Sequence, residues 1–158
     1  MKQRGFEIIS DYKAEGINLP ERATKGAAGY DFEAAETIVI PSIWQQRENG
    51  TAPKPTLVKT GIKAYMGESE YLELVSRSSN PLKRFLMLAN GVGVIDRDYY
   101  NNPDNEGHIM FQFLNFGYEE VRIEKGERIG QGIFKPFLLA DEDYVETERT
   151  GGFGSSGQ

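Results

Sequence analysis

The 158-residue sequence contains no cysteine and only one histidine, His108. A chain without cysteine forms neither a disulfide framework nor a thiolate metal site. A single histidine also argues against a histidine-based zinc centre, because such centres draw on several imidazole or thiolate ligands. Any metal that this protein uses is therefore expected to be a hard cation bound by oxygen atoms.

The sequence also lacks long apolar runs and an excess of positive charge. No stretch approaches the roughly 20 apolar residues of a transmembrane helix, and the N-terminal MKQRGFEIIS lacks the apolar run of a signal peptide. We therefore expect a cytoplasmic protein with no membrane partner. The formal net charge of -6 argues against general nucleic-acid binding, since that depends on Lys and Arg at the phosphates.

Short apolar or alternating runs, separated by turn residues, recur along the chain and predict an all-β fold of many short strands. These runs are FEIIS, YDFEA, TIVIP, TLVKTGIKAYM, YLELVS, FLMLAN, IMFQFLNF, VRIEKG and RIGQGIFKPF. The segment NPLKRFLMLA predicts one short helix, with Asn80 as its cap and Pro81 in its first turn. Residues 44–56 and 101–107 predict exposed loops, because Gly, Pro and Asn accumulate there.

The C-terminal RTGGFGSSGQ combines glycine and serine with a single aromatic residue, Phe153. Such a composition predicts a flexible tail, residues 149–158, after one β domain over residues 1–148. A plain linker would rarely carry an arginine and a phenylalanine. We therefore expect a lid that becomes ordered over a ligand: Phe153 stacks on a ring, Arg149 binds an anion, and Ser155 and Ser156 donate hydrogen bonds.

The stretch NGVGVIDRDYY carries the strongest candidate for catalysis. Gly91 and Gly93 predict a backbone that approaches another group closely. Asp96 follows an apolar strand, where a partly desolvated carboxylate suits a general base acting on water. The alternative is an ordinary hairpin in which Asp96 or Asp98 is a turn residue.

Three weaker candidates surround this stretch. Arg77, Ser78 and Ser79 fit a phosphate-binding loop before the helix, although they also fit simple helix capping. The strand GERIGQGIF, with Gln131, taken alone is an ordinary polar edge. Asp31 lies among small residues and fits a buried hydrogen-bonding carboxylate better than a catalyst. Together these stretches describe a site for a nucleoside triphosphate.

The motifs AGYDF, RSS, NGVGVIDRDY, GERIGQ and GGFGSSG occur in this order over residues 28–157. In order and wording they resemble the five motifs of the trimeric dUTPase family, the dUTP diphosphatases. The resemblance implies a jelly-roll-like fold and a homotrimer with active sites at its subunit interfaces. It also implies Mg²⁺-dependent hydrolysis of dUTP to dUMP and pyrophosphate, which keeps uracil out of DNA and supplies dUMP for thymidylate synthesis.

The resemblance also assigns roles around the nucleoside. Asp96 would activate the water that attacks the α-phosphorus and would meet the 3′-hydroxyl. Tyr99 would lie under the deoxyribose and exclude a 2′-hydroxyl. Asn90 and the backbone at Val94 and Ile95 would read the uracil edge.

The remaining roles concern the phosphates, the metal and the lid. The positions that match the second and fourth motifs are Arg77, Ser78, Ser79 and Gln131. Phe153 would stack over the uracil of a neighbouring subunit's site, while Arg149, Ser155 and Ser156 hold the γ-phosphate. Mg²⁺ would have no direct protein ligand and would be held by substrate phosphates and water; Asp31 would support that water shell or simply the fold.

The sequence departs from the family pattern at three places. Residues 101–106 insert before Gly107, so that Met110 falls at a position that contacts the substrate in the family. Arg149 precedes Phe153 by four residues, one fewer than the pattern expects. The loop at 44–56 is longer than usual, and an elongated loop either carries partner contacts or has no such role.

Two other functions remain open from the sequence. A dCTP deaminase, or a bifunctional deaminase and diphosphatase, shares the fold and a related third motif. A dUTPase-like regulatory protein would bind the nucleotide to control a protein partner. The GVIDRDYY and GGFGSSG motifs favour the diphosphatase.

Overall fold

The structure is a computed structural model that describes residues 1–154, and in this part of the chain the strands dominate. The strands are β1 (Gly5–Ile8), β2 (Tyr30–Glu33), β3 (Ile38–Ile40), β4 (Thr56–Lys59), β5 (Ile62–Tyr65), β6 (Glu70–Ser76), β7 (Leu86–Leu88), β8 (Gly93–Ile95), β9 (Met110–Asn115), β10 (Val121–Ile123) and β11 (Arg128–Pro136). The α-helices are α1 (Ile43–Glu48) and α2 (Ser79–Arg84), and the 3₁₀ turns are η1 (Ser10–Tyr12) and η2 (Arg97–Tyr99). None of these helices has the length and apolar character needed to cross a membrane. The predicted all-β class is confirmed.

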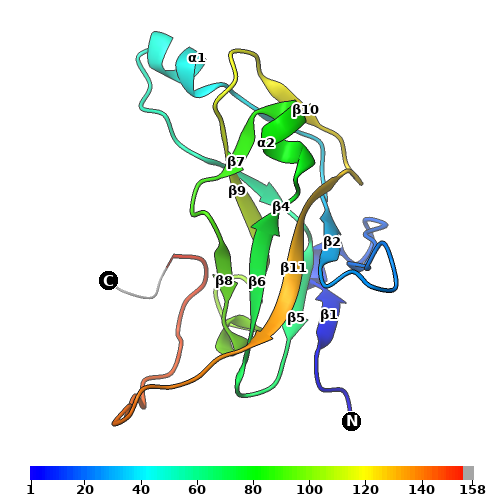
Figure 1. Ribbon diagram of the computed structural model, residues 1–158, viewed down its shortest axis with the longest axis vertical. Helices are drawn as coiled ribbons and strands as arrows, with labels where there is room; N and C mark the ends of the chain where they lie inside the picture. Colours follow the sequence, from blue (N-terminus) through cyan, green and yellow to red (C-terminus); the bar gives the residue numbers. More distant parts are fainter. Residues whose placement is uncertain (155–158) are drawn as a thin grey trace.

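The strands form antiparallel sheets whose neighbours are often far apart in sequence (Figure 1). The largest sheet has the order β2-β11-β6-β8, and a second has the order β4-β9-β7. The pairs β1-β5 and β10-β3 complete the arrangement. This wrapping of non-consecutive strands is the jelly-roll-like architecture expected from the sequence.

The core lies between the two larger sheets. Residues of β9 alternate between half-buried and buried, so that Phe111 and Phe113 both point inward. Phe111 meets Phe32 of β2 edge to face, with ring centroids 5.6 Å apart. Burial of each such ring contributes about 1.5–3 kcal/mol, so the sheets are held together mainly by apolar packing.

Strand β11 lies in a different position in its sheet from the one predicted from the sequence. GERIGQGIF was expected to be a polar edge, but β11 pairs with β2 on one side and with β6 on the other. It is therefore an interior strand that forms the middle of the largest sheet. Interior strands are normally recognised by a run of apolar residues, and in β11 Gly130 and Gly132 interrupt that run.

The helix predicted to start at Asn80 begins one residue earlier than predicted and is shorter than the predicted segment. Helix α2 begins at Ser79 with Ser78 as its N-cap, and it ends because Phe85 adopts a left-handed conformation, with φ 55°. Asn80 does not cap the helix; its buried amide donates to the Ile129 carbonyl at 2.8 Å. The apolar residues that follow form β7, which pairs with β9.

A second helix lies where only a loop was expected. Helix α1 occupies the start of the 44–56 segment and has a capping box between Ser42 and Gln45. The Ser42 hydroxyl accepts a hydrogen bond from the Trp44 N–H at 3.1 Å. The Ser-x-x-Gln pattern predicts this N-terminus, so the sequence held a signal that the loop interpretation missed.

Candidate active site

The third motif forms β8 and the turn η2 behind it. Strand β8 pairs with β6, with Ile95 opposite Leu72, and Asp96 follows as the N-cap of η2. A Cβ at position 93 would lie 3.0 Å from the Leu74 Cβ, so glycine lets β8 pack closely on β6. The predicted close approach is therefore confirmed at Gly93, where the neighbour is a side chain of the same sheet.

A cavity of about 240 Å³ opens in front of β8. Its wall includes most of the nucleoside-binding residues predicted from the sequence, together with part of the tail. The lining residues are Leu74, Asn90, Gly93, Val94, Ile95, Asp96, Tyr99, Met110, Gln112, Arg149, Gly152, Phe153 and Gly154. The structure thus brings the third motif and the described part of the fifth motif into one site.

Asp96 lies at the rim of this cavity with half of its side chain exposed. Burial of the other half raises the pKa of Asp96 above its ordinary value. The Arg149 charge opposes this shift and the Asp98 charge adds to it. A carboxyl group whose pKa is raised in this way is a stronger base than a fully solvated one.

Tyr99 forms the floor beside Asp96 and is only 5% exposed. Its hydroxyl donates to the His108 carbonyl at 2.7 Å and accepts from the Asn105 amide at 2.9 Å. Burial raises the pKa of this phenol, which therefore stays neutral. Because both hydrogen bonds are made within the protein, the ring is held in one orientation.

Arg149 brings the tail onto the cavity of its own chain. Its guanidinium donates to Asp98 at 2.8 Å and to Asp96 at 2.7 Å, and it lies 5.8 Å from the centre of the Tyr99 ring. Phe153, four residues later, lines the same cavity. The structure therefore pairs Arg149 with the candidate base. Ser155 and Ser156 lie outside the described residues.

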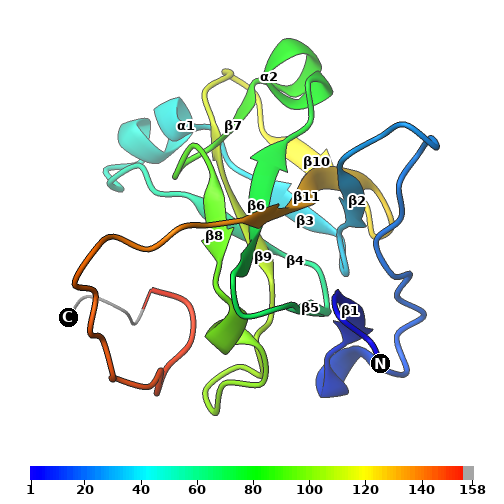
Figure 2. The same cartoon turned by 60° about the horizontal axis from the view of Figure 1, so that its bottom comes forward.

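The predicted phosphate-binding residues lie elsewhere in the chain. Arg77 follows the last residue of β6, which pairs with Gly130, whereas Ile95 pairs with Leu72 four residues earlier. Four residues of strand span about 13 Å. Figure 2 shows α2 and the tail on different sides of the molecule. The structure therefore does not bring Arg77, Ser78, Ser79 or Gln131 into the cavity.

Asp31 lies beside this second group of residues. Its carboxylate is 3.7 Å from the Arg77 Nε and 3.6 Å from the Arg128 guanidinium. In β2, Asp31 stands opposite Gln131 of β11. These contacts make Asp31 an ion-pair partner of both arginines.

The described residues contain no cluster of three or more His, Asp or Glu side chains arranged to bind a metal ion. His108 has a different role: its Nε2 accepts the Gly61 N–H at 2.9 Å. Burial lowers the pKa of His108 to about 4, so its imidazole is neutral near pH 7. His108 therefore contributes to the fold behind Tyr99.

Sequence reasoning missed Gln112, which lines the cavity, and Asn105, which hydrogen-bonds to Tyr99. Gln112 lies two residues beyond Met110 in β9, and alternate residues of a strand face the same side. That spacing could have identified Gln112 once Met110 was placed in the site. Asn105, which holds Tyr99, had no such signal, because its role depends on the path of the 101–107 loop.

The all-β fold and the cavity with Asp96 in its wall fit a β protein of the nucleotide-hydrolysing class. Residues 15–157 match the sequence profile of the dUTPase family. The chain is 56% identical to the deoxyuridine 5′-triphosphate nucleotidohydrolase of Lactococcus lactis over 99% of both chains. This chain belongs to the dUTPase family and is a dUTP-hydrolysing enzyme.

Solved structures agree with this assignment. The crystal structure of dUTPase from Streptococcus mutans is 51% identical and has a TM-score of 0.77, covering 87% of this chain and 98% of that one. A mutant dUTPase from phage phi11 of Staphylococcus aureus, described with a structural Mg(II) ion, has a TM-score of 0.70. It is 21% identical over 92% of this chain and 98% of its own, which supports the fold alone.

Proposed function

We propose that the enzyme hydrolyses dUTP to dUMP and pyrophosphate with Asp96 as the general base. The observation that carries this proposal is the position of the Asp96 carboxylate at the rim of a cavity floored by Tyr99. Asp96 would accept a proton from a water molecule as the water oxygen forms a bond to the α-phosphorus. The bond from the α-phosphorus to the bridging oxygen breaks, and pyrophosphate leaves with the electron pair.

The cavity wall supports selection of a deoxyuridine nucleotide. Backbone groups at Val94 and Ile95, with the Asn90 side chain, would bind the uracil edge. Cytosine would leave buried polar groups of this wall unpaired, which costs up to ~10⁴-fold in discrimination. The ring of Tyr99, held by Asn105 and His108, would exclude a ribose 2′-hydroxyl. Met110 and Gln112 would complete the wall.

Mg²⁺ is the proposed cofactor. The described side chains offer isolated carboxylates and no cage, which suits a cation that binds substrate phosphates and keeps several waters. When bound to the triphosphate, Mg²⁺ would supply positive charge that offsets the charge developing on the phosphates. The protein's own part is to place Asp96 and the arginines around that group.

A shared active site follows from the distance between the two groups of residues. Within one chain Asp96 lines the cavity, whereas Arg77 and Gln131 do not. A triphosphate bound at Asp96 would therefore take its phosphate contacts from another subunit. This supports a homotrimer in which Arg77, Ser78, Ser79 and Gln131 of one chain complete the cavity of the next. The tail over residues 149–158 would act as the lid.

The test is pyrophosphate release from dUTP, with dCTP, dTTP and UTP in parallel and Mg²⁺ present, for the wild type and Asp96→Asn. We expect selective cleavage of dUTP and a loss of at least about 10²-fold in kcat in the variant, as for removal of a general base. An active Asp96→Asn enzyme would refute this assignment of the base. Ammonia release from dCTP would identify a deaminase instead, and binding of dUTP without cleavage would favour a regulatory role.

A further inference from the structure

The residues inserted before Gly107 form a closed loop. The Asn101 N–H donates to the Glu106 carbonyl at 3.0 Å, which joins the two ends of the loop. Asn101 and Glu106 both adopt left-handed conformations, with φ 56° and 63°, that turn the chain sharply at these ends. We call residues 101–107 the platform loop.

A buried lysine, Lys63, fixes the platform loop to the body of the molecule through Asn101 and Glu106. Lys63 of β5 is only 8% exposed, and its Nζ donates to Asn101 at 2.6 Å and to Glu106 at 2.7 Å. The Glu106 carboxylate also accepts the N–H and the hydroxyl of Ser10, at 3.0 and 3.1 Å. These charge-assisted bonds hold the base of the loop against β5 and η1.

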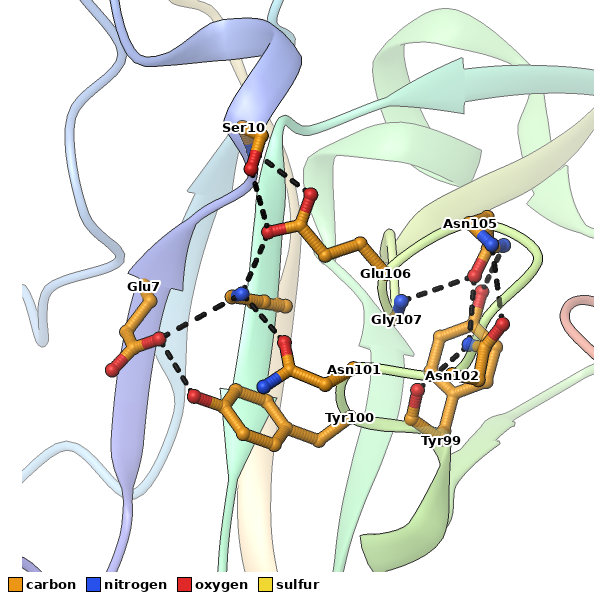
Figure 3. Close-up of polar contacts among 10 residues, drawn as sticks. Glu7, Ser10, Tyr99, Tyr100, Asn101, Asn102, Asn105, Glu106 and Gly107 are labelled. Atoms are coloured by element: carbon orange, nitrogen blue, oxygen red, sulfur yellow. Dashed lines mark hydrogen bonds and ion pairs between the residues drawn. The ribbon is translucent and has the colours of Figure 1, made fainter.

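The tip of the platform loop is equally well fixed, because the Asn105 amide is hydrogen-bonded on both sides. Its oxygen accepts the Gly107 N–H at 3.1 Å and the Asn102 amide at 2.8 Å. Its nitrogen donates to the Tyr99 hydroxyl at 2.9 Å. Asn105 thus connects the loop directly to the floor of the cavity (Figure 3).

The tail lies against this tip. A Cβ at Gly152 would be 2.5 Å from an Asp104 carboxylate oxygen and 2.9 Å from the Asn105 amide. Since Asn105 is held by three hydrogen bonds, it cannot move aside, and only glycine lets the tail come so near. Arg149 before this contact and Phe153 after it both line the cavity.

We propose that the platform loop is the docking surface of the lid, with Asp104 and Asn105 as positioning residues that seat the tail at Gly152. This inference rests on the proposed function, in which the tail covers the bound nucleotide. Ordering a glycine-rich segment costs conformational entropy, and a docking surface that is already rigid adds nothing to that cost. The platform loop therefore assists closure and sets where Arg149 and Phe153 come to rest.

The experiment uses a trypsin site that the natural tail already contains, the bond after Arg149. Loss of residues 150–158 is followed by mass spectrometry in the wild type, Gly152→Ala and Asp104→Ala, with and without a non-hydrolysable α,β-imido analogue of dUTP. We expect cleavage in Gly152→Ala to be about tenfold faster, since an added methyl group in a packed contact is strongly unfavourable. Asp104→Ala leaves the tail sequence unchanged and is also expected to be cleaved faster.

Asp11→Ala is the matched control, because it removes an exposed carboxylate that lies beside the platform loop but does not line the cavity covered by the tail. It should be cleaved at the wild-type rate, and the analogue should protect it as it protects the wild type. Wild-type rates in both Gly152→Ala and Asp104→Ala, with and without the analogue, would overturn the inference.

Pyrophosphate release from dUTP by the same wild-type preparation separates two kinds of failure. If the wild type does not cleave dUTP, the proposed function fails. If it cleaves dUTP while both variants are digested like the wild type, only the role of the platform loop fails.

Discussion

Asp96 combines two opposing influences on its charge. Partial burial raises the pKa of the Asp96 carboxyl, while the Arg149 guanidinium at 2.7 Å lowers it. The neighbouring Asp98 acts with burial. Arg149 therefore favours the ionised form of Asp96, the form that the proposed general base requires.

This arrangement predicts a pH shift in Arg149→Ala. Asp96 must be ionised to accept a proton, so kcat/KM falls as the pH drops through the pKa of Asp96. Removing Arg149 takes away the charge that lowers this pKa, so the acidic limb should move to higher pH. We also expect kcat/KM near neutral pH to fall by roughly 10- to 100-fold, the value of one or two hydrogen bonds to a charged group.

The measurement is the profile of kcat/KM for dUTP against pH, which reports groups of the free enzyme. Arg22→Ala serves as the control, since Arg22 is exposed and bonds only to nearby backbone carbonyls in the described structure. An acidic limb at the same pH in the wild type and Arg149→Ala would contradict the proposed link between Arg149 and Asp96.

At the scale of elements, the platform loop shows how an insertion can be rigid without regular secondary structure. Its base depends on the ion pair between Glu106 and Lys63, which is largely withdrawn from solvent. Hydrogen bonds from Lys63 and Ser10 hold the pKa of Glu106 at about 2. Glu106 therefore remains ionised in the folded protein over the whole ordinary pH range.

We predict that Glu106→Gln lowers the free energy of unfolding by about 1.5–3 kcal/mol near neutral pH, since it removes hydrogen bonds to a charged group. The lowered pKa of Glu106 stabilises the fold fully above its unfolded value of 4.5, and that contribution is lost as the pH falls toward about 2. The difference between the variant and the wild type should shrink over this window.

Urea denaturation at a series of pH values measures this difference. Glu68→Gln, which changes an exposed glutamate in the turn before β6, is the control and should match the wild type at every pH. A Glu106→Gln protein as stable as the control near neutral pH would show that the loop is not anchored through this carboxylate.

At the scale of the whole molecule, the residues of one chain that are proposed to act on dUTP are divided between two places. Asp96 and Tyr99 lie at the cavity, and Arg77 lies with Asp31 near the start of α2. We therefore expect two inactive variants to complement each other in mixed trimers. A cavity from an Arg77→Ala chain would be completed by the intact Arg77 of an Asp96→Asn chain.

Co-expression of the two variants with different affinity tags tests this expectation. Random mixing should restore about a quarter of the sites, since each working site needs one particular neighbour. The control is a mixture of the same two variants, each assembled separately before mixing. Mixed trimers that purify with both tags and show no recovered dUTP hydrolysis would place the whole site within one chain.

The same experiment can locate the lid. The family resemblance implies a tail that closes on a neighbouring subunit, whereas the single chain has Arg149 on its own Asp96. Arg149→Ala chains mixed with Asp96→Asn chains should recover activity only if the lid crosses between subunits.

The cytoplasmic location, the role of Mg²⁺ and the domain boundary at residue 148 also stay predictions.

The local sequence determined most of the strands and the position of Asp96 at the end of one of them. Alternating residues such as those of β9 predict strands because side chains of a strand face opposite sides, and these strands were found. The third motif placed Asp96 after an apolar strand, and the structure has it there. The predicted bounds of α2 and the predicted loop in place of α1 were wrong, because Phe85 ends α2 in a left-handed conformation and the capping box at Ser42 was not recognised.

Only the tertiary structure decided which of these residues meet. The pairing of Arg149 with Asp96, the separation of Arg77 from the cavity and the contact of Gly152 with Asp104 join segments that are distant in sequence. No local pattern encodes such contacts, because they depend on how strands pair and how a loop is anchored. The burial that raises the pKa of Asp96 arises in the same way, so the chemistry of the site belongs to the fold as a whole.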